Sequence, residues 1–270
     1  MIYLYKHNPE GNSFTLSFDE DPQVQEGFGI GGSIVGKETE NGIIYYKVVA
    51  ERVTYADGQP DGLTIRLRMH APGSQQYTWR TGASEHGYIG TEKDNENFEA
   101  TIYFRVHDFN KTHTSFSWII RGGVHGGSHD PRSSCIGMQV PYANLKAKVF
   151  KELDHPDYDF LTINRKFDYA IQENKWLAVK VVSFLEEQQK RTRNFLYLDT
   201  NPYNEDGSPR NDFHLYTEWN DIEGVSTGQY VKAALWAGWE TTFRVDGWKS
   251  LDIAHFSIRE VIPKKTFEEK

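Results

Sequence analysis

The chain has 270 residues, which is enough for one large domain or two small ones with a sizeable hydrophobic core. A formal net charge of −8 argues against nucleic acid as the main partner, because phosphate binding needs a basic surface. The single cysteine, Cys135, excludes an intramolecular disulfide and is expected to be a small buried residue.

The N-terminal segment MIYLYKHNPEG lacks the basic and apolar regions of a signal peptide, and no stretch approaches 18 consecutive apolar residues. We therefore expect a soluble chain without a membrane partner. Secretion with the signal peptide already removed is left open.

Alternation of apolar and polar residues with a period of two dominates the rest of the chain, which is the pattern of half-buried antiparallel strands. The predicted strands cover residues 44–55, 63–70, 98–106, 115–120, 135–142, 144–150, 176–184, 194–199, 213–219, 230–235, 241–245 and 251–261. The segment 182–194 (VSFLEEQQKRTRN) has too poor an apolar face for a helix and is predicted to be a strand followed by a charged turn.

About a dozen strands separated by Gly-rich and Pro-rich turns predict an all-β protein, an antiparallel β-sandwich of the jelly-roll, concanavalin A-like type. We find no repeat and no linker, so residues 1–270 are expected to form a single domain. Residues 1–40 would form an N-terminal arm or a sheet edge.

Two strands carry basic residues on the side that should face solvent. One presents Arg66, Arg68 and His70, and the other presents Tyr103, Arg105 and His107. We expect both rows in a groove on the concave sheet, where guanidinium groups would bind a carboxylated or sulfated sugar. The alternative is that the arginines only pair with acids on neighbouring strands, for example Glu99.

Further candidates lie in two connecting segments. RGGVHGGSHDPRSSC contains His125, His129 and Asp130, but their spacing fits no zinc pattern, so we predict a loop over a groove and no metal. KELDHPDY contains His155 and Tyr158, and the proline after His155 would fix a turn that presents both at a sheet edge.

Acidic residues permit other interpretations. Asp221 and Glu223 would lie on the same face of one strand, as the carboxylates of a retaining glycosidase do. Glu218 would lie on that face only if a bulge intervened. The alternative is that these acids lie in a solvated turn. We predict no cofactor, although a structural calcium ion is conceivable at loop oxygens. These belong to Asp57, Asp61, Asn204, Glu205 and Asp206. Arg244 is expected to form a sheet-locking bridge with Asp246 and not to act in the site.

The segments HAPGSQQYTWRTGASEHGYIG, NFEATIYFRV, RGGVHGG and TTFRVDGWKSLDIAHFSIREV resemble jelly-roll polysaccharide lyases of the alginate-lyase type and related uncharacterised sandwich proteins. The resemblance covers roughly residues 60–262 and implies Gln139, Lys232 and Trp236 as substrate-binding positions. Pro141 stands where the lyase motif has its His, and Trp236 replaces the catalytic Tyr. The catalytic pair would then have moved to His125 or His155 with Tyr158.

The resulting hypothesis is a carbohydrate-active protein that cleaves an acidic polysaccharide by β-elimination, acting as a monomer on a poly- or oligosaccharide. The first alternative is a non-catalytic carbohydrate-binding module or lectin, in which a tryptophan stacks on sugar; the candidates are Trp79, Trp118, Trp219 and Trp236. A retaining glycoside hydrolase and a structural sandwich without ligand remain further alternatives.

Overall fold

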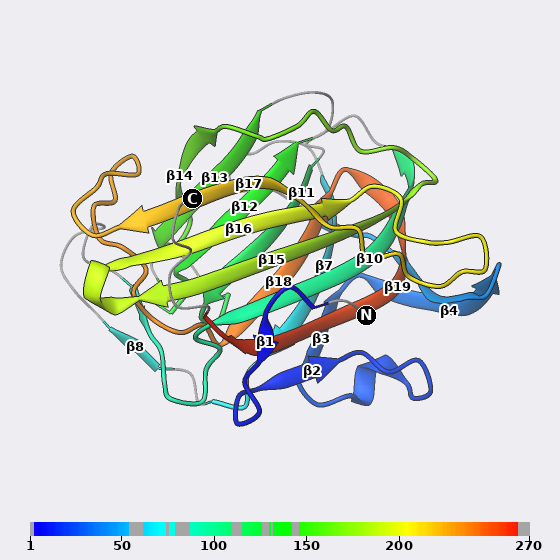
Figure 1. Ribbon diagram of the computed structural model, residues 1–270, viewed down its shortest axis with the longest axis horizontal. Helices are drawn as coiled ribbons and strands as arrows, with labels where there is room; N and C mark the ends of the chain where they lie inside the picture. The colour runs from blue at the N-terminus through cyan, green and yellow to red at the C-terminus, as the bar shows by residue number, and fades with distance from the viewer. Residues whose placement is uncertain are drawn as a thin grey trace.

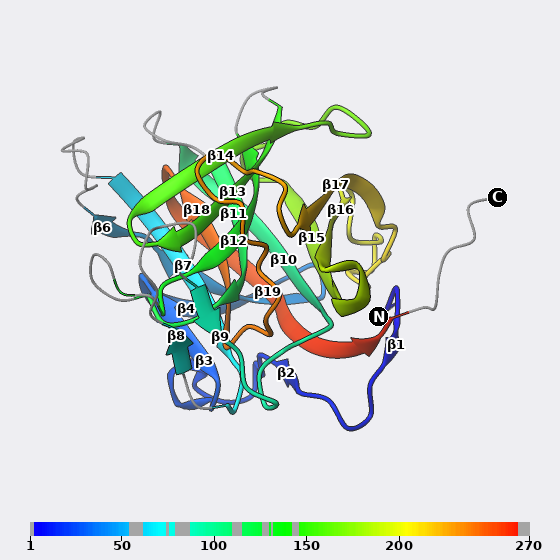
Figure 2. The same cartoon turned by 90° about the vertical axis from the view of Figure 1, so that its left-hand side faces the viewer.

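The computed structural model describes residues 3–53, 62–73, 76–78, 87–109, 115–125, 130, 132–141 and 146–263. Two antiparallel sheets lie face to face, which confirms the all-β sandwich of jelly-roll type (Figure 1). In the view of Figure 2, β7, β18, β11 and β12 form one layer and β15, β16 and β17 lie in the other. No helix in the described part of the chain is long and apolar enough to cross a membrane.

The nine-stranded sheet has the order β17-β16-β15-β10-β19-β5-β4, with β1 and β2 also paired to β19. The strands are β17 (His214–Ile222), β16 (Arg191–Asp199), β15 (Trp176–Glu186), β10 (Phe98–Phe109), β19 (Trp248–Ile262), β5 (Ile43–Val49), β4 (Ser33–Glu40), β1 (Lys6–His7) and β2 (Ser13–Thr15).

The eight-stranded sheet has the order β14-β13-β12-β11-β18-β7-β3, with β6 paired to β7. The strands are β14 (Asp157–Ile163), β13 (Ala147–Asp154), β12 (Cys135–Pro141), β11 (Ser115–Gly122), β18 (Glu240–Asp246), β7 (Gly62–His70), β3 (Phe28–Gly31) and β6 (Glu51–Val53). A hairpin of β8 (Gln76–Thr78) and β9 (Gly87–Ile89) and the short 3₁₀ turns η1 (Pro22–Val24) and η3 (Glu187–Gln189) complete the described elements.

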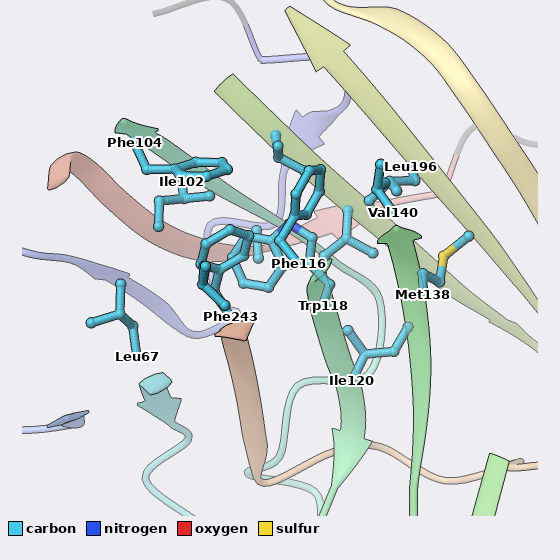
Figure 3. Packing of buried hydrophobic residues seen from close by; sticks show 14 of the residues in the cluster. Leu67, Ile102, Phe104, Phe116, Trp118, Ile120, Met138, Val140, Leu196 and Phe243 are labelled. Atoms are coloured by element: carbon cyan, nitrogen blue, oxygen red, sulfur yellow. The ribbon is translucent and has the colours of Figure 1, made fainter. Parts of the chain in front are cut away.

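The core lies between the sheets and is built from the apolar positions of the alternating strands. Phe104 of β10 meets Phe116 of β11 and Phe243 of β18, with ring centroids 5.5 and 4.9 Å apart. Trp118 is fully buried beside them (Figure 3). Because neighbouring side chains on a strand point to opposite faces, this core fixes which residues face outward.

Most predicted strands are present, with ends shifted by a few residues. The charged turn after residue 186 is η3, so that prediction is confirmed. Residues 230–235 form no strand, because the backbone N–H groups of Ala233 and Ala234 donate to the carboxylates of Glu223 and Asp221 instead of to a neighbouring strand. Residues 3–40 supply β1 and β2 and the terminal strands β3 and β4 of the two sheets.

Candidate functional site

The outer face of the eight-stranded sheet carries a row of arginines. Core residues Ile65, Leu67 and Met69 of β7 are completely buried, so the alternate residues Arg66 and Arg68 point outward. Arg66 lies directly opposite Arg244 in the register between β7 and β18. Like charges in directly opposed positions destabilise a sheet, so a contribution to folding stability does not explain why these two arginines are paired.

Each arginine of this row has an acidic neighbour, and Arg68 Nε lies 3.6 Å from Oε1 of Glu240. Arg66 Nη1 lies 3.6 Å from Oε1 of Glu51, whose side chain is 40% exposed. Arg244 Nε donates to Asp246 Oδ1 at 2.9 Å, which confirms the predicted bridge. Burial, and then the positive charges of Arg244 and Arg68, lower the pKa of Arg66. A bound anion would relieve that repulsion.

A cavity of about 40 Å³ opens beside these arginines, and we call it the arginine pocket. It is lined by Arg66, Arg68, Arg244, His125, Phe150, Glu152, Tyr158, Glu240 and Thr242, together with residues 122–124 and 133–135 and Ile119. A single water needs roughly 10–15 Å³ of such space, so the cavity has room for a few waters or one small charged group. A whole sugar ring would have to lie outside it, across the sheet.

Glu152 organises the far wall of the pocket. Its Oε1 accepts a 2.6 Å hydrogen bond from His155 Nδ1, and its Oε2 accepts one from the thiol of Cys135 at 3.4 Å. The turn between β13 and β14 places His155 above Glu152, and Tyr158 is the direct cross-strand partner of Glu152. The His155 ring lies 4.7 Å from the His125 ring. Cys135 is buried, as the sequence predicted.

An aromatic wall adjoins this cluster. The Phe150 ring lies over Gly137, where any Cβ would come within 2.0 Å of ring atoms. The missing side chain therefore lets Phe150 lie flat on the sheet, with Tyr158 packed edge-on at 5.6 Å. Phe150 and Tyr158 give the pocket an apolar surface next to its charged groups.

The titratable groups in the arginine pocket and beside it differ in protonation. The hydrogen bond that His155 donates to Glu152 raises the pKa of His155, which favours the imidazolium. Partial loss of water and the nearby Arg66 lower the pKa of His125 to about 4, so this ring is neutral near pH 7. Burial raises the pKa of Tyr158, which keeps its phenol protonated. The site thus combines cations, a neutral imidazole and a phenol donor.

Glu240 is a second buried carboxylate in the lining. Burial raises its pKa, but hydrogen bonds from His70 and Thr242 outweigh that effect and hold the pKa below its ordinary value. Its Oε2 lies 3.2 Å from His70 Nε2, and the His70 ring stacks on Trp239 at 4.2 Å. His70 therefore braces Glu240 and does not line the pocket.

The second predicted row lies on the other sheet. Phe104 and Val106 of β10 enter the core, so Tyr103, Arg105 and His107 face outward from the nine-stranded sheet. The prediction that both rows line one groove is wrong, because β7 and β10 turn their outer faces in opposite directions.

The chemistry of this second row is also structural. Tyr103 is 1% exposed, because Tyr203 and Phe213 of the β16–β17 connection cover it. Arg105 pairs with Asp252 and Glu40, both at 2.7 Å. The alternative of cross-strand pairing with acids therefore holds for Arg105, whereas Glu99 pairs with Lys180 and Arg259.

The positions implied by the lyase resemblance do not form a site. Trp236 is 8% exposed, and its indole N–H donates to the Arg121 carbonyl at 2.8 Å, so it cannot stack on a sugar. Lys232 lies over the Trp236 ring at 5.8 Å. Gln139 donates to Ser115 Oγ at 2.9 Å. Neither Gln139 nor Lys232 lines the arginine pocket.

The predicted glycosidase carboxylates are not a catalytic pair. Asp221 is 1% exposed inside the sandwich, where its Oδ1 accepts a 2.8 Å bond from Lys151 Nζ. Glu223 Oε2 accepts the N–H of Ala233. Both acids therefore stabilise the chain locally, and the hydrolase hypothesis loses its residues. Trp118 is buried in the core, and Trp79 lies outside the described residues.

Of the suggested calcium ligands, Asn204 and Asp206 form hydrogen bonds within their own turn. Asp206 Oδ1 accepts bonds from the Ser208 backbone N–H and hydroxyl, and the Asn204 amide also donates to Ser208. Asp206 Oδ1 and the Asn204 side-chain N–H therefore both help to close this turn. Asp130 pairs with Arg132 at 2.7 Å. His129, Asp57 and Asp61 lie outside the described residues, within which no three His, Cys, Asp or Glu side chains form a metal cluster.

Sequence reasoning found Arg66, Arg68, His125, His155 and Tyr158 as candidates, and the structure brings these five together. Sequence reasoning missed Phe150, Glu152 and Glu240. It predicted only a sheet-stabilising role for Arg244. The alternation in AKVFKELD places Phe150 and Glu152 on the same face, so that signal was present. Which of the two faces looks outward becomes known only when β13 is placed in its sheet.

No protein-family model and no curated protein matches this sequence. Several solved structures are similar in fold. The VIP36 exoplasmic/lumenal domain, in a Ca²⁺/Man₃GlcNAc-bound form, has 10% identity and a TM-score of 0.45, over 94% of this chain and 93% of that one.

The winged bean acidic lectin, complexed with methyl-α-D-galactose, has 8% identity and a TM-score of 0.42, over 94% of this chain and 99% of that one. The carbohydrate-binding module CBM66 from Bacillus subtilis has 13% identity and a TM-score of 0.38, over 87% and 93% of the two chains.

Proposed function

We propose that this protein is a non-catalytic, lectin-like binder of acidic saccharides that holds the acid group of the sugar in the arginine pocket. The observation that carries the proposal is the direct opposition of Arg66 and Arg244, a like-charge pair that costs the sheet stability. Arginine forks match carboxylate and sulfate oxygens, so an acidic sugar would stabilise this arrangement.

The size and lining of the pocket support the same ligand class. A volume of about 40 Å³ suits a carboxylate or sulfate and leaves the sugar ring over the sheet. The half-buried Tyr158 ring stands beside the charged groups, where the apolar face of a pyranose can pack on it, and the buried Phe150 ring supports Tyr158 edge-on. Recognition would then combine a charged anchor with a small aromatic surface.

A second candidate, β-elimination of a uronate, is favoured by the cluster of His125, His155 and Tyr158. Neutral His125 would remove the C5 proton, the arginines would neutralise the carboxylate, and the Tyr158 phenol would protonate the leaving oxygen. The ring centroids of His125 and His155 are 4.7 Å apart, and those of His155 and Tyr158 are 6.3 Å apart. These distances allow one sugar residue to meet all three groups.

The two functions separate in one experiment. The protein is incubated with polygalacturonate, alginate and a neutral glucan, while bound ligand, reducing ends and the ultraviolet absorbance of unsaturated uronate are followed together. The proposal predicts saturable binding to an acidic polymer, no product, and loss of binding in Arg66→Gln. If the wild type forms unsaturated product and His125→Gln forms none, the lyase function replaces the binding proposal. Absence of binding to every acidic polymer would refute both.

A further inference from the structure

We infer that a second binding site, for a neutral oligosaccharide, lies at one end of the nine-stranded sheet, on the opposite side of the sandwich from the arginine pocket. A groove with a volume of about 620 Å³ lies there between the segment 167–176 and Thr200–Tyr203, and we call it the Trp176 groove. Small-molecule sites have volumes of roughly 300–1,000 Å³, so the groove has room for a ligand much larger than the one the arginine pocket can hold.

The first wall of the groove is the connection between β14 and β15, and it is fixed at both ends. Near its start, Lys166 N–H donates to the Tyr216 carbonyl, and Phe167 packs on the Tyr216 ring at 5.4 Å. Near its end, Asn174 N–H donates to the Val106 carbonyl. Ile171 is buried between these anchors. This wall is therefore held in one shape by the rest of the fold.

The second wall is the start of the connection between β16 and β17. Both carboxylate oxygens of Asp199 hold it, because one accepts the N–H of Asn201 at 3.1 Å and the other accepts the N–H of Asp212 at 2.8 Å. The Tyr203 ring lies edge-on to Trp176 at 5.5 Å and contacts the Tyr103 ring. A wall that is already ordered avoids the entropic cost of being ordered by a ligand.

The row of β10 predicted to bind substrate lies behind this groove and supports it. Arg105 stacks on Trp176 with its guanidinium carbon 4.7 Å from the ring centroid. His107 lies between two acceptors, with Nε2 2.7 Å from Asp252 Oδ2 and Nδ1 2.6 Å from Asn174 Oδ1. The pKa of His107 is raised, because the bond to Asp252 favours the imidazolium. Arg105 and His107 are therefore positioning residues for Trp176 and Asn174.

The lining indicates a neutral, hydroxyl-rich ligand. Trp176, Tyr169 and Tyr203 are half-buried rings in the lining. The exposed side chains beside them are the uncharged Gln172, Asn174, Asn201 and Thr200, together with one residue of each charge, Lys175 and Asp168. Within the described residues, the side-chain amides of Gln172 and Asn201 have no hydrogen-bond partner. Asp168 is already paired with Arg165 at 2.7 Å. Aromatic surfaces with uncharged donors and acceptors match the apolar faces and hydroxyls of a neutral sugar.

The test uses three neutral glucose hexasaccharides, with α-1,4, β-1,4 or β-1,3 linkages, titrated into the full chain by calorimetry and tryptophan fluorescence. We expect one of them to bind with a change in fluorescence, and the double variant Gln172→Ala/Asn201→Ala to bind it at least about tenfold more weakly, from the loss of two hydrogen bonds. The matched control Gln188→Ala/Gln189→Ala changes two exposed amides beyond the opposite end of β15 and should leave the affinity unchanged (Figure 1).

Arg66→Gln separates this site from the proposed function. It should leave hexasaccharide binding intact even where acidic binding is lost, because the two sites lie on different sheets. No binding of any hexasaccharide, or equal affinity in the groove variant and the control variant, would overturn the Trp176 groove and leave the arginine pocket untouched. Loss of hexasaccharide binding in Arg66→Gln would also contradict the claim that the Trp176 groove is separate from the arginine pocket.

Discussion

Arg66 and Arg244 are direct cross-strand neighbours on the outer face of the eight-stranded sheet. Arg105, at the corresponding outward position of β10, instead pairs with Asp252, whose side chain is 2% exposed. The same residue type therefore carries an electrostatic cost on one sheet and stabilises the other. Unfavourable contacts of this kind are expected to be retained at functional sites, where the same residues bind a ligand.

This contrast predicts opposite stability changes for one kind of substitution. Arg66→Gln removes a like-charge contact and a weak surface pair, so the free energy of unfolding should stay constant or rise by up to about 1 kcal/mol. Arg105→Gln leaves the buried Asp252 carboxylate with His107 as its remaining cationic partner, and the loss of the charged hydrogen bonds should lower the free energy of unfolding by about 2 kcal/mol. Urea denaturation of both variants measures the difference. A large loss of stability in Arg66→Gln would mean that Arg66 is structural.

The buried pair of Lys151 and Asp221 links the two sheets inside the sandwich. Asp221→Ala should lower the free energy of unfolding by about 3–5 kcal/mol, because a buried ammonium loses its partner. The double variant Lys151→Met/Asp221→Leu should recover part of this loss, because the ammonium is removed but the Ala234 N–H still lacks its acceptor. Thermal denaturation in parallel with saccharide binding checks the assignment. A variant that keeps its melting temperature but loses an activity would restore Asp221 as a functional residue.

His155 should titrate above an ordinary histidine as long as Glu152 is present. A histidine with a raised pKa adds stability that is fully present below the unfolded pKa of about 6.5 and is lost as the pH rises through the folded pKa. NMR titration of the ring should give a lower pKa in Glu152→Gln than in the wild type. An unchanged pKa would show that the 2.6 Å contact does not form in solution.

We expect the folded state to lose stability in acid because of His255. Burial, and then the charge of Lys180, lower its pKa to about 4, so protonation favours the unfolded chain. Its contribution is fully present above pH 6.5 and is lost as the pH falls towards 4, by about 3 kcal/mol in all. Stability measured across this range should fall less steeply in His255→Gln. Parallel curves for the two proteins would contradict the assignment.

Gly137 should be intolerant of substitution because of the Phe150 ring above it. A Cβ at this position would meet ring atoms at 2.0 Å, so Gly137→Ala should displace Phe150 and lower both stability and acidic-saccharide binding. Gly36→Ala is the matched control, since it is also a strand glycine and nothing lies within 4 Å of its added methyl group. Equal effects of the two substitutions would show that Phe150 does not depend on Gly137.

The alternating pattern was enough to predict most strands and the all-β sandwich, because a period of two appears directly in the order of residues. It could not predict which strands are neighbours. Arg66 and Arg105 occupy equivalent patterns, yet their strands belong to different sheets. Trp236 and Asp221 look like surface residues in sequence and are buried because the chain around residues 221–236 folds onto Arg121 and Lys151. Such long-range contacts leave no periodic signal.

The most direct test is a titration of the protein with a short galacturonate oligosaccharide and with the same oligosaccharide after reduction of its carboxylates to alcohols. The arginine side-chain N–H signals are followed by NMR and assigned with Arg66→Gln and Arg244→Gln. The proposal predicts that the acidic ligand shifts the signals of Arg66 and Arg244 and that the reduced ligand leaves them in place. Equal shifts with both ligands, or none with the acidic one, would contradict recognition of the carboxylate in the arginine pocket.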